Sequence, residues 1–194
     1  FPRPGGTILF NETKTIVAIV DGEFYDAPAR KNELSARGHR FSGDCDAEII
    51  VHLFEESGID CIRKLDGMFA FALYDKELGA LYLGRDRLGK KPLFYHLENR
   101  TIAFASTLAM LRPSPGFSEE LDREAISDFL SFGYVPHPQT VYRRTKKLAP
   151  AHYLVFGVSS GSAETVRYRK IDFGKKTGLS YSDAAAELRR RFEE

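Results

Sequence analysis

The chain has 194 residues, of which 43% are hydrophobic and 28% charged, and its formal net charge is +1. These values fit one domain with a sizeable core, and they give no support for a nucleic-acid partner. No apolar run approaches the roughly 20 residues of a membrane span, and no signal-peptide pattern is present. Two cysteines, Cys45 and Cys61, are too few for a disulfide framework or a zinc site, so we expect a reduced, cytoplasmic protein without a metal.

The first elements in the chain are predicted to be two strands and a helix. The loop at residues 1–6 precedes strands over residues 7–10 and 15–20. The second strand runs into Asp21, Gly22 and Glu23, which we interpret as a sharp polar turn. Asp26 is then expected to cap a helix over residues 27–37. Such a strand–turn–helix is common, and taken alone it is more often structural than functional.

A second helix is predicted to begin at Asp44 or Asp46 and to end at Gly58. We expect His52, which lies on this helix, to be partly exposed and to have no ligand role. The apolar side chains share one helix face: Ile49, Ile50, Leu53 and Phe54.

An antiparallel meander follows, in which Phe69 and Phe71 alternate with small residues and are expected to be buried. Its charged turn contains Asp86 and Arg87, which we interpret as a structural ion pair. The strands of the meander are predicted over residues 67–75, 80–84 and 101–105, with one more strand after the charged turn.

The last third of the chain combines helices with two strands. A short helix over residues 107–111 precedes a helix that Asp122 caps and Gly133 ends. A final helix leaves Leu188 and Phe192 without a partner, which indicates the beginning of a second domain. The remaining elements are strands over residues 151–158 and 164–168, a linker over 174–178 and that final helix over 184–192. The tally is an α+β chain.

Six motifs stand in order and at specific spacings: residues 21–26, 38–41, 46–50, 65–71, 85–93 and 132–136. Together they resemble the N-terminal class II glutamine amidotransferase domain of glutamine-hydrolysing asparagine synthetases, which has the Ntn-hydrolase fold. The resemblance implies a four-layer α/β/β/α sandwich of two antiparallel sheets, here without its N-terminal strand. It assigns residues 1–173 to the amidotransferase domain and residues 174–194 to a linker and the first helix of an ATP-dependent synthetase domain that lies outside this sequence.

The resemblance also implies a reaction and its partners. Family members hydrolyse L-glutamine to glutamate and ammonia, and a C-terminal synthetase domain uses the ammonia to amidate aspartate. No cofactor is expected in this domain, whereas ATP and Mg²⁺ are expected in the synthetase domain, and a homodimer is possible. The family nucleophile is an N-terminal cysteine whose own α-amino group acts as the base. This sequence begins inside the family pattern, so that cysteine and the arginine-bearing loop that grips the substrate carboxylate are absent, and we expect the chain as given to be inactive.

Four residues match the family's site. Glu23 and Asp46 match the carboxylates that hold the glutamine α-amino group, although both could instead serve only as turn or cap residues. Gly22 and position 21 match the oxyanion hole, but Asp21 replaces the family asparagine. An ionised carboxylate only accepts hydrogen bonds, and losing one oxyanion donor costs about 3–4 kcal/mol of barrier.

We expect the carboxylates of Asp21, Glu23 and Asp46 to converge on one pocket, whose negative potential is not balanced by a positive charge. On this hypothesis Asp21→Asn relieves repulsion and stabilises the fold at neutral pH. Two alternatives to the glutaminase hypothesis stay open: a degenerate, non-catalytic amidotransferase-like domain with a docking or regulatory role, and an amidotransferase with another acceptor, similar to β-lactam synthetase.

Overall fold

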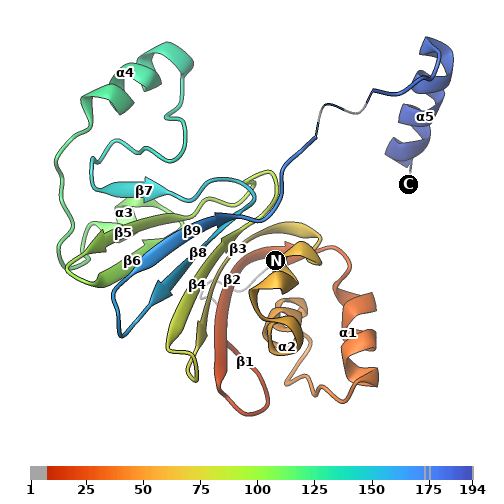
Figure 1. Cartoon of the computed structure of the whole chain (residues 1–194), viewed down its shortest axis with the longest axis horizontal. Helices are drawn as coiled ribbons and strands as arrows, with labels where there is room; N and C mark the ends of the chain where they lie inside the picture. Colours follow the sequence, from red (N-terminus) through yellow and green to blue (C-terminus); the bar gives the residue numbers. More distant parts are fainter. Residues whose placement is uncertain (1–7, 173, 175, 194) are drawn as a thin grey trace.

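The structure is a computed structural model that describes residues 8–172, 174 and 176–193. It contains a six-stranded antiparallel sheet in the order β1-β2-β3-β4-β8-β9 and a three-stranded antiparallel sheet in the order β6-β5-β7 (Figure 1). The strands are β1 Leu9–Phe10, β2 Ile16–Phe24, β3 Gly67–Asp75, β4 Ala80–Arg85, β5 Phe94–Glu98, β6 Thr101–Ala105, β7 Thr145–Lys147, β8 His152–Gly157 and β9 Ala163–Arg167. The helices are α1 Ala27–Ala36, α2 Ile49–Ser57, α3 Leu108–Leu111, α4 Arg123–Phe132 and α5 Tyr181–Glu193, with 3-10 turns η1 Asp46–Glu48 and η2 Gly58–Arg63.

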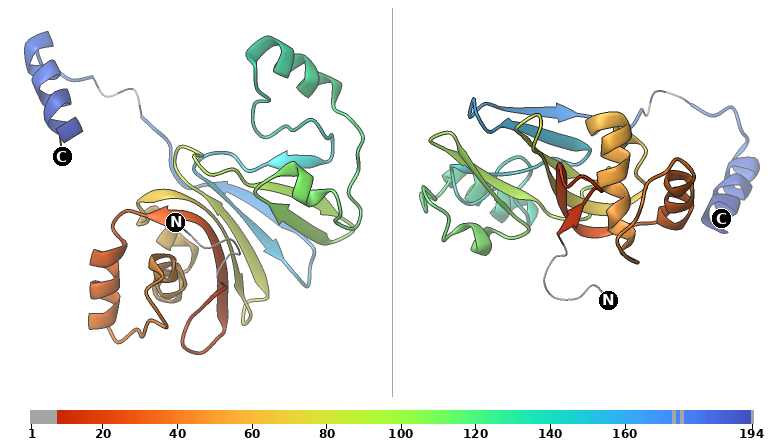
Figure 2. Two further views of the ribbon diagram at one scale, coloured as in Figure 1. Left: turned by 180° about the vertical axis from the view of Figure 1, so that it is seen from behind. Right: turned by 90° about the horizontal axis from the view of Figure 1, so that it is seen from below.

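The elements form layers. Helices α1 and α2 cover one face of the larger sheet, and the smaller sheet lies on its other side (Figures 1 and 2). Strand β3 shows why, because its large side chains Phe69 and Phe71 join the core under the helices while Ala70 and Ala72 join the core between the sheets. The predicted sandwich of two antiparallel sheets with outer helices is confirmed. The predicted meander is divided between the sheets, since β3 and β4 belong to one and β5 and β6 to the other.

Phe71 is buried as predicted, and a glycine makes room for its ring. Phe71 stands opposite Gly84 in the β3–β4 register, and its side chain is 2% exposed. A Cβ atom added to Gly84 would lie 2.2 Å from the Phe71 ring. The ring therefore occupies the space over the glycine, and neither residue can be enlarged without moving the other.

The predicted turn at Asp21, Gly22 and Glu23 is wrong. These residues continue β2 and pair with Ala70, Phe69 and Met68 of β3. Pairing along a full neighbouring strand outweighs the local turn preference of Asp-Gly, because every added pair satisfies further backbone groups.

Helix ends were predicted with mixed success. Helix α4 begins and ends as predicted: the Asp122 carboxylate accepts from the backbone N–H of Glu124 and Ala125, and Gly133 takes φ 76°. Asp26 occupies the N-cap position of α1 as predicted, but its carboxylate binds Arg30 and forms no capping hydrogen bond. The predicted cap of the second helix is wrong, because α2 begins at Ile49 and Asp46 is the first residue of η1.

His52 is the clearest error about burial. Its side chain is 0% exposed, because the rings of His39 and Phe41, from the connection that follows α1, pack against it.

The predictions for the two ends of the chain can be compared with the structure only in part. The predicted loop at residues 1–6 lies outside the described residues, and so do positions 173 and 175 of the linker region. Helix α5 forms where a final helix was predicted, carries no buried residue and lies apart from both sheets (Figure 1). No helix of the described residues is long and apolar enough to cross a membrane.

Candidate functional site

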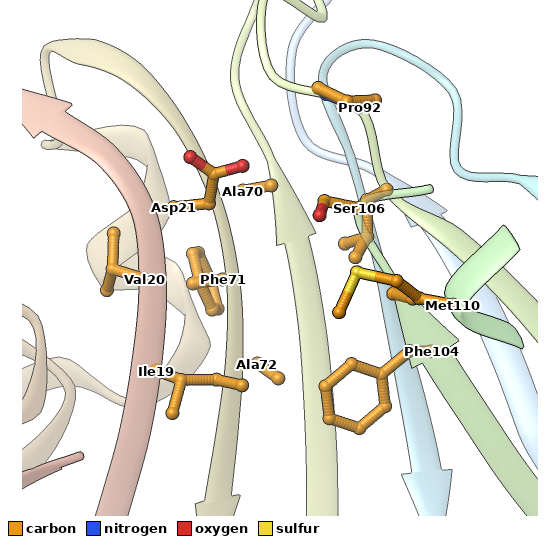
Figure 3. Close-up of a pocket in the computed structure, with 12 residues that line it drawn as sticks. Ile19, Val20, Asp21, Ala70, Phe71, Ala72, Pro92, Phe104, Ser106 and Met110 are labelled. Atoms are coloured by element: carbon orange, nitrogen blue, oxygen red, sulfur yellow. The ribbon is translucent and has the colours of Figure 1, made fainter. Parts of the chain in front are cut away.

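A cavity of about 380 Å³ opens between the two sheets. On one side it is lined by Ile19 and Asp21 of β2 with Ala70 and Ala72 of β3. On the other side it is lined by Pro92, Phe104, Ser106 and Met110 (Figure 3). Asp21 and Ser106 supply the polar side chains of this otherwise apolar lining. A small apolar cavity with a few polar groups is the usual form of a small-molecule site.

Asp21 is not an isolated negative charge. Its side chain is 48% exposed, and its Oδ1 lies 3.0 Å from the Nζ of Lys91, whose side chain is 30% exposed. The expectation of unbalanced negative potential at Asp21 is therefore wrong. The pair places a carboxylate and an ammonium together at the edge of the cavity.

Lys91 is positioned by the loop that follows β4. The buried Asp86 carboxylate accepts hydrogen bonds from the backbone N–H groups of Leu88, Lys90 and Lys91, at 2.9 to 3.1 Å. The loop thus wraps around one carboxylate, which fixes the backbone that carries the Lys91 side chain. The predicted Asp86–Arg87 ion pair is wrong, because the oxygens of Asp86 are taken up by this loop.

Arg85 holds the same loop from the other side. Its guanidinium donates to the carbonyl oxygens of Gly89 and Lys91, at 2.7 and 2.6 Å, and to that of Leu148 at 2.6 Å. Burial lowers the pKa of Arg85, with the nearby Asp86 charge acting in the opposite direction. An arginine with three carbonyl acceptors is rigid, so the loop is preorganised.

Gly22 occupies a position in β2 that only glycine tolerates. Its φ is 137°, and a Cβ atom there would lie 2.0 Å from the Met68 carbonyl oxygen. Glu23 follows on the same face of β2 as Asp21, because side chains alternate along a strand, and it is exposed. The structure therefore brings Asp21, Gly22 and Glu23 to one end of β2, as a strand segment.

Asp46 belongs to a different layer. It is the first residue of η1, whose neighbours Cys45 and Ala47 pack against the core under the helices. The carboxylate oxygens of Asp21, Glu23 and Asp46 do not all lie within 4.8 Å of one another. The three carboxylates therefore do not form one close acidic cluster, because Asp21 lines the cavity between the sheets whereas η1 lies in the helical layer. That Glu23 and Asp46 serve one substrate stays a prediction.

Neither cysteine lines the cavity. Cys61 is fully buried, and burial raises the pKa of its thiol to about 12, which keeps it protonated and unreactive. Cys45 is half-buried against the core. Within the described residues, the cavity has no thiol nucleophile.

Two other places in the described part of the chain can be compared with this site. A larger cavity of about 650 Å³ is lined by Arg87, Lys90 and Arg167, but by none of the four predicted site residues. A cluster of Glu12, His39, His52 and Glu55 contains potential metal ligands, and it also lies away from the cavity.

Lys91, Ser106 and Met110 were missed from the sequence. Lys91 stands within one of the recognised motifs, but its motif gives no sign that it reaches β2. The available signal was that the charged loop directly follows β4. Since β2 and β4 both pair with β3, a long side chain from that loop can reach β2. Ser106 and Met110 come from a segment whose contact with β2 depends on how the two sheets stack.

Comparisons with known proteins give a consistent result. Residues 4–169 match the family model described as "Glutamine amidotransferase domain". The chain is 34% identical over 181 residues to asparagine synthetase [glutamine-hydrolyzing] 3 of Bacillus subtilis (strain 168), covering 93% of this chain and 29% of that protein. It is 40% identical over 110 residues to asparagine synthetase B [glutamine-hydrolyzing] of Escherichia coli (strain K12), covering 56% of this chain and 20% of that protein.

A solved structure shares the fold. The glutamine phosphoribosylpyrophosphate amidotransferase from B. subtilis superposes with a TM-score of 0.57 at 17% identity, over 85% of this chain and 32% of that one. The chain spans less than a third of the length of the curated relatives named above.

Proposed function

Because the chain belongs to the glutamine amidotransferase domain family, we propose that it is the ammonia-supplying unit of an ATP-dependent, asparagine-synthetase-like amidotransferase. In this proposal L-glutamine and water give glutamate and ammonia, and a synthetase domain outside these 194 residues uses the ammonia to amidate aspartate. That domain would bind ATP and Mg²⁺. The names of the curated relatives support this assignment.

The proposal gives each residue at the end of β2 a role. Gly22 N–H and the side chain at position 21 face the oxyanion that forms when the glutamine amide is attacked. Glu23, an exposed carboxylate two residues from Asp21, holds the substrate ammonium group, and Asp46 assists from η1, which packs against β2. Both carboxylates suit a cationic group because charge-assisted hydrogen bonds are the stronger ones.

The observation that carries the proposal is the ion pair of Lys91 with Asp21 at the cavity edge. A lone Asp21 would repel a developing oxyanion. With the Lys91 ammonium 3.0 Å away, the negative charge of Asp21 is balanced, and the ammonium has further N–H groups that can donate to the oxyanion. The substitution of aspartate for the family asparagine is therefore compatible with amide hydrolysis in this chain.

The two cysteines set the limit of what the chain does by itself. Cys61 is buried and Cys45 does not line the cavity, so we expect no glutamate release from the isolated 194 residues. The test compares this chain with the protein encoded by the complete open reading frame, both given L-glutamine. We expect glutamate release from the complete protein, abolished by a thiol-blocking reagent.

Two outcomes would contradict the proposal. Thiol-dependent glutamate release from the isolated chain would show that one of its own cysteines is the nucleophile. A complete protein that forms its amide product from ammonia and never from glutamine would make the domain a degenerate module. The asparagine synthetase names of the relatives do not favour that alternative, nor a different acceptor.

The proposal extends to the assembly and location of the protein. We propose a cytoplasmic enzyme in which the amidotransferase unit contacts the synthetase domain, and a homodimer of the complete protein. Light scattering of the complete protein tests the second point, since a monomer would refute it.

A further inference from the structure

Four potential metal ligands gather where three segments meet beside α2. Glu12 comes from the turn between β1 and β2, His39 from the connection after α1, and His52 and Glu55 from α2 itself. One ligand atom from each of these residues lies within 4.8 Å of every other. His39 Nδ1 is 3.5 Å from Glu12 Oε1 and 3.8 Å from Glu55 Oε2, and His52 Nδ1 is 3.3 Å from Glu12 Oε2.

His52 supplies the second, independent observation. Its side chain is 0% exposed, and neither ring nitrogen has a hydrogen-bond partner. Nδ1 is close to Glu12, but the two atoms are not aligned for a hydrogen bond. Buried polar atoms in native proteins nearly always have a partner, so an imidazole aimed at two carboxylates without bonding to them needs an explanation.

The charges around the imidazoles suit a cation. Glu48 and Glu56 also approach the two histidines, at 3.8 and 3.5 Å, and Arg37 pairs with Glu56. A neutral imidazole is the form that binds a metal.

We propose that Glu12, His39, His52 and Glu55 form a zinc site. Imidazole nitrogens and carboxylate oxygens are zinc ligands, and four protein ligands without an open position are typical of a structural site. Tetrahedral ligands at zinc distances lie about 3.3 Å apart, so the wider pairs must close on binding. The Glu55 side chain is 36% exposed, which leaves it free to move inward. Glu12 is held in place because its Oε1 accepts a hydrogen bond from the Arg40 backbone N–H at 2.7 Å, and its Oε2, 3.3 Å from His52 Nδ1, is left for the ion.

Such a site would join the β1–β2 turn, the connection after α1 and helix α2. Two of these elements also contact their neighbours in the fold, since β1 and α2 both contact η1, and α2 contacts β2. The inference is independent of the proposed function, since none of the four ligands lines the cavity between the sheets. The expectation that the chain has no zinc site rested on its cysteine count, which left histidines and carboxylates out.

The experiment titrates ZnCl₂ alone into the metal-free chain that carries Cys45→Ser, so that the half-buried thiol cannot bind the ion. Competition with a chromogenic chelator gives stoichiometry and affinity, and thermal melts give stabilisation. We expect one Zn²⁺ per chain and a melting temperature that rises with zinc concentration. Co²⁺ in place of Zn²⁺ should show the visible absorption of a tetrahedral site.

Variants separate a built site from adventitious binding. His39→Gln and Glu55→Gln should each weaken zinc binding at least tenfold, and both side chains are more exposed than that of His52, so these variants disturb the core least. His152→Gln, which removes a histidine from β8, should leave affinity unchanged. Zinc binding that is equally tight in His39→Gln, or no binding to the parent chain, would overturn the proposal.

Discussion

Asp21→Asn tests the arrangement at the end of β2 most simply. The change keeps the size of the side chain and removes its charge, so it breaks the ion pair with Lys91 at 3.0 Å. Because the two side chains are 48% and 30% exposed, solvent screens the pair, and its loss should cost about 0.2–1 kcal/mol. In a chain of this size a loss of 1 kcal/mol lowers the melting temperature by about 2–4 °C.

Thermal melts at neutral pH measure this effect. Asp21→Asn should melt below the parent, and the difference should shrink in about 1 M NaCl, where the Debye length is about 3 Å. Asp44→Asn is the matched control, because Asp44 is exposed and forms no ion pair within the described residues. An Asp21→Asn chain that melts above the parent would refute the reasoning, because it would restore the sequence-based picture in which Asp21 is repelled by other carboxylates.

Three further predictions concern the core and its protonation. Phe71→Ala should cost about 3–5 kcal/mol in the free energy of unfolding, measured by urea denaturation, and a change below 1 kcal/mol would contradict the burial of its ring. Gly84→Ala should cost about 1–3 kcal/mol in the same assay because its Cβ meets that ring, and it should cost less in the Phe71→Ala background. The lowered pKa of His52 means that its unfolded form binds a proton the folded form excludes, so stability is fully present above pH 6.5 and is lost as pH falls toward the folded-state pKa. His52→Gln should flatten that pH dependence in denaturation curves, and an unchanged slope would show that other groups cause it.

The sequence predicted local structure well where the signals were local. Helix α4 has both of its signals in its own residues, a capping Asp122 and a left-handed Gly133, and both its ends were correct. Strand β2 was ended too early at Val20, because Asp-Gly favours a turn locally. Its continuation to Phe24 depends on pairing with Gly67 and Met68, which lie more than forty residues away in the sequence.

The sequence predicted which residues lie at the end of β2 better than it predicted how the site residues are placed relative to one another. Asp21, Gly22 and Glu23 do lie together at the end of a strand, where the motif placed them. Their relation to Asp46 was not predictable, because it depends on which face of the sheet each side chain takes. A chain extended as β2 turns every second side chain away from the helical layer, whereas a turn at the same residues would have left their directions open.

Lys91 shows the same limit for charge. The number of carboxylates in the motifs predicted a negatively charged pocket, but the loop after β4, which Asp86 and Arg85 hold, brings Lys91 to Asp21 of β2. The buried His52 was missed for a related reason, since the side chains that cover it, His39 and Phe41, come from the connection after α1 and not from its own helix.

The most direct test of the account compares two nitrogen sources in the complete protein. With ATP, Mg²⁺ and aspartate supplied, Glu23→Gln should lower kcat/KM for glutamine by about 10- to 100-fold, because a charge-assisted hydrogen bond to the substrate ammonium is worth about 1.5–3 kcal/mol. Product formation from free ammonia should stay at the parent rate, and Glu77→Gln, an exposed glutamate in the β3–β4 turn, should change neither. Equal loss of the glutamine and ammonia reactions in Glu23→Gln, or no loss of either, would contradict the assignment of this site to glutamine.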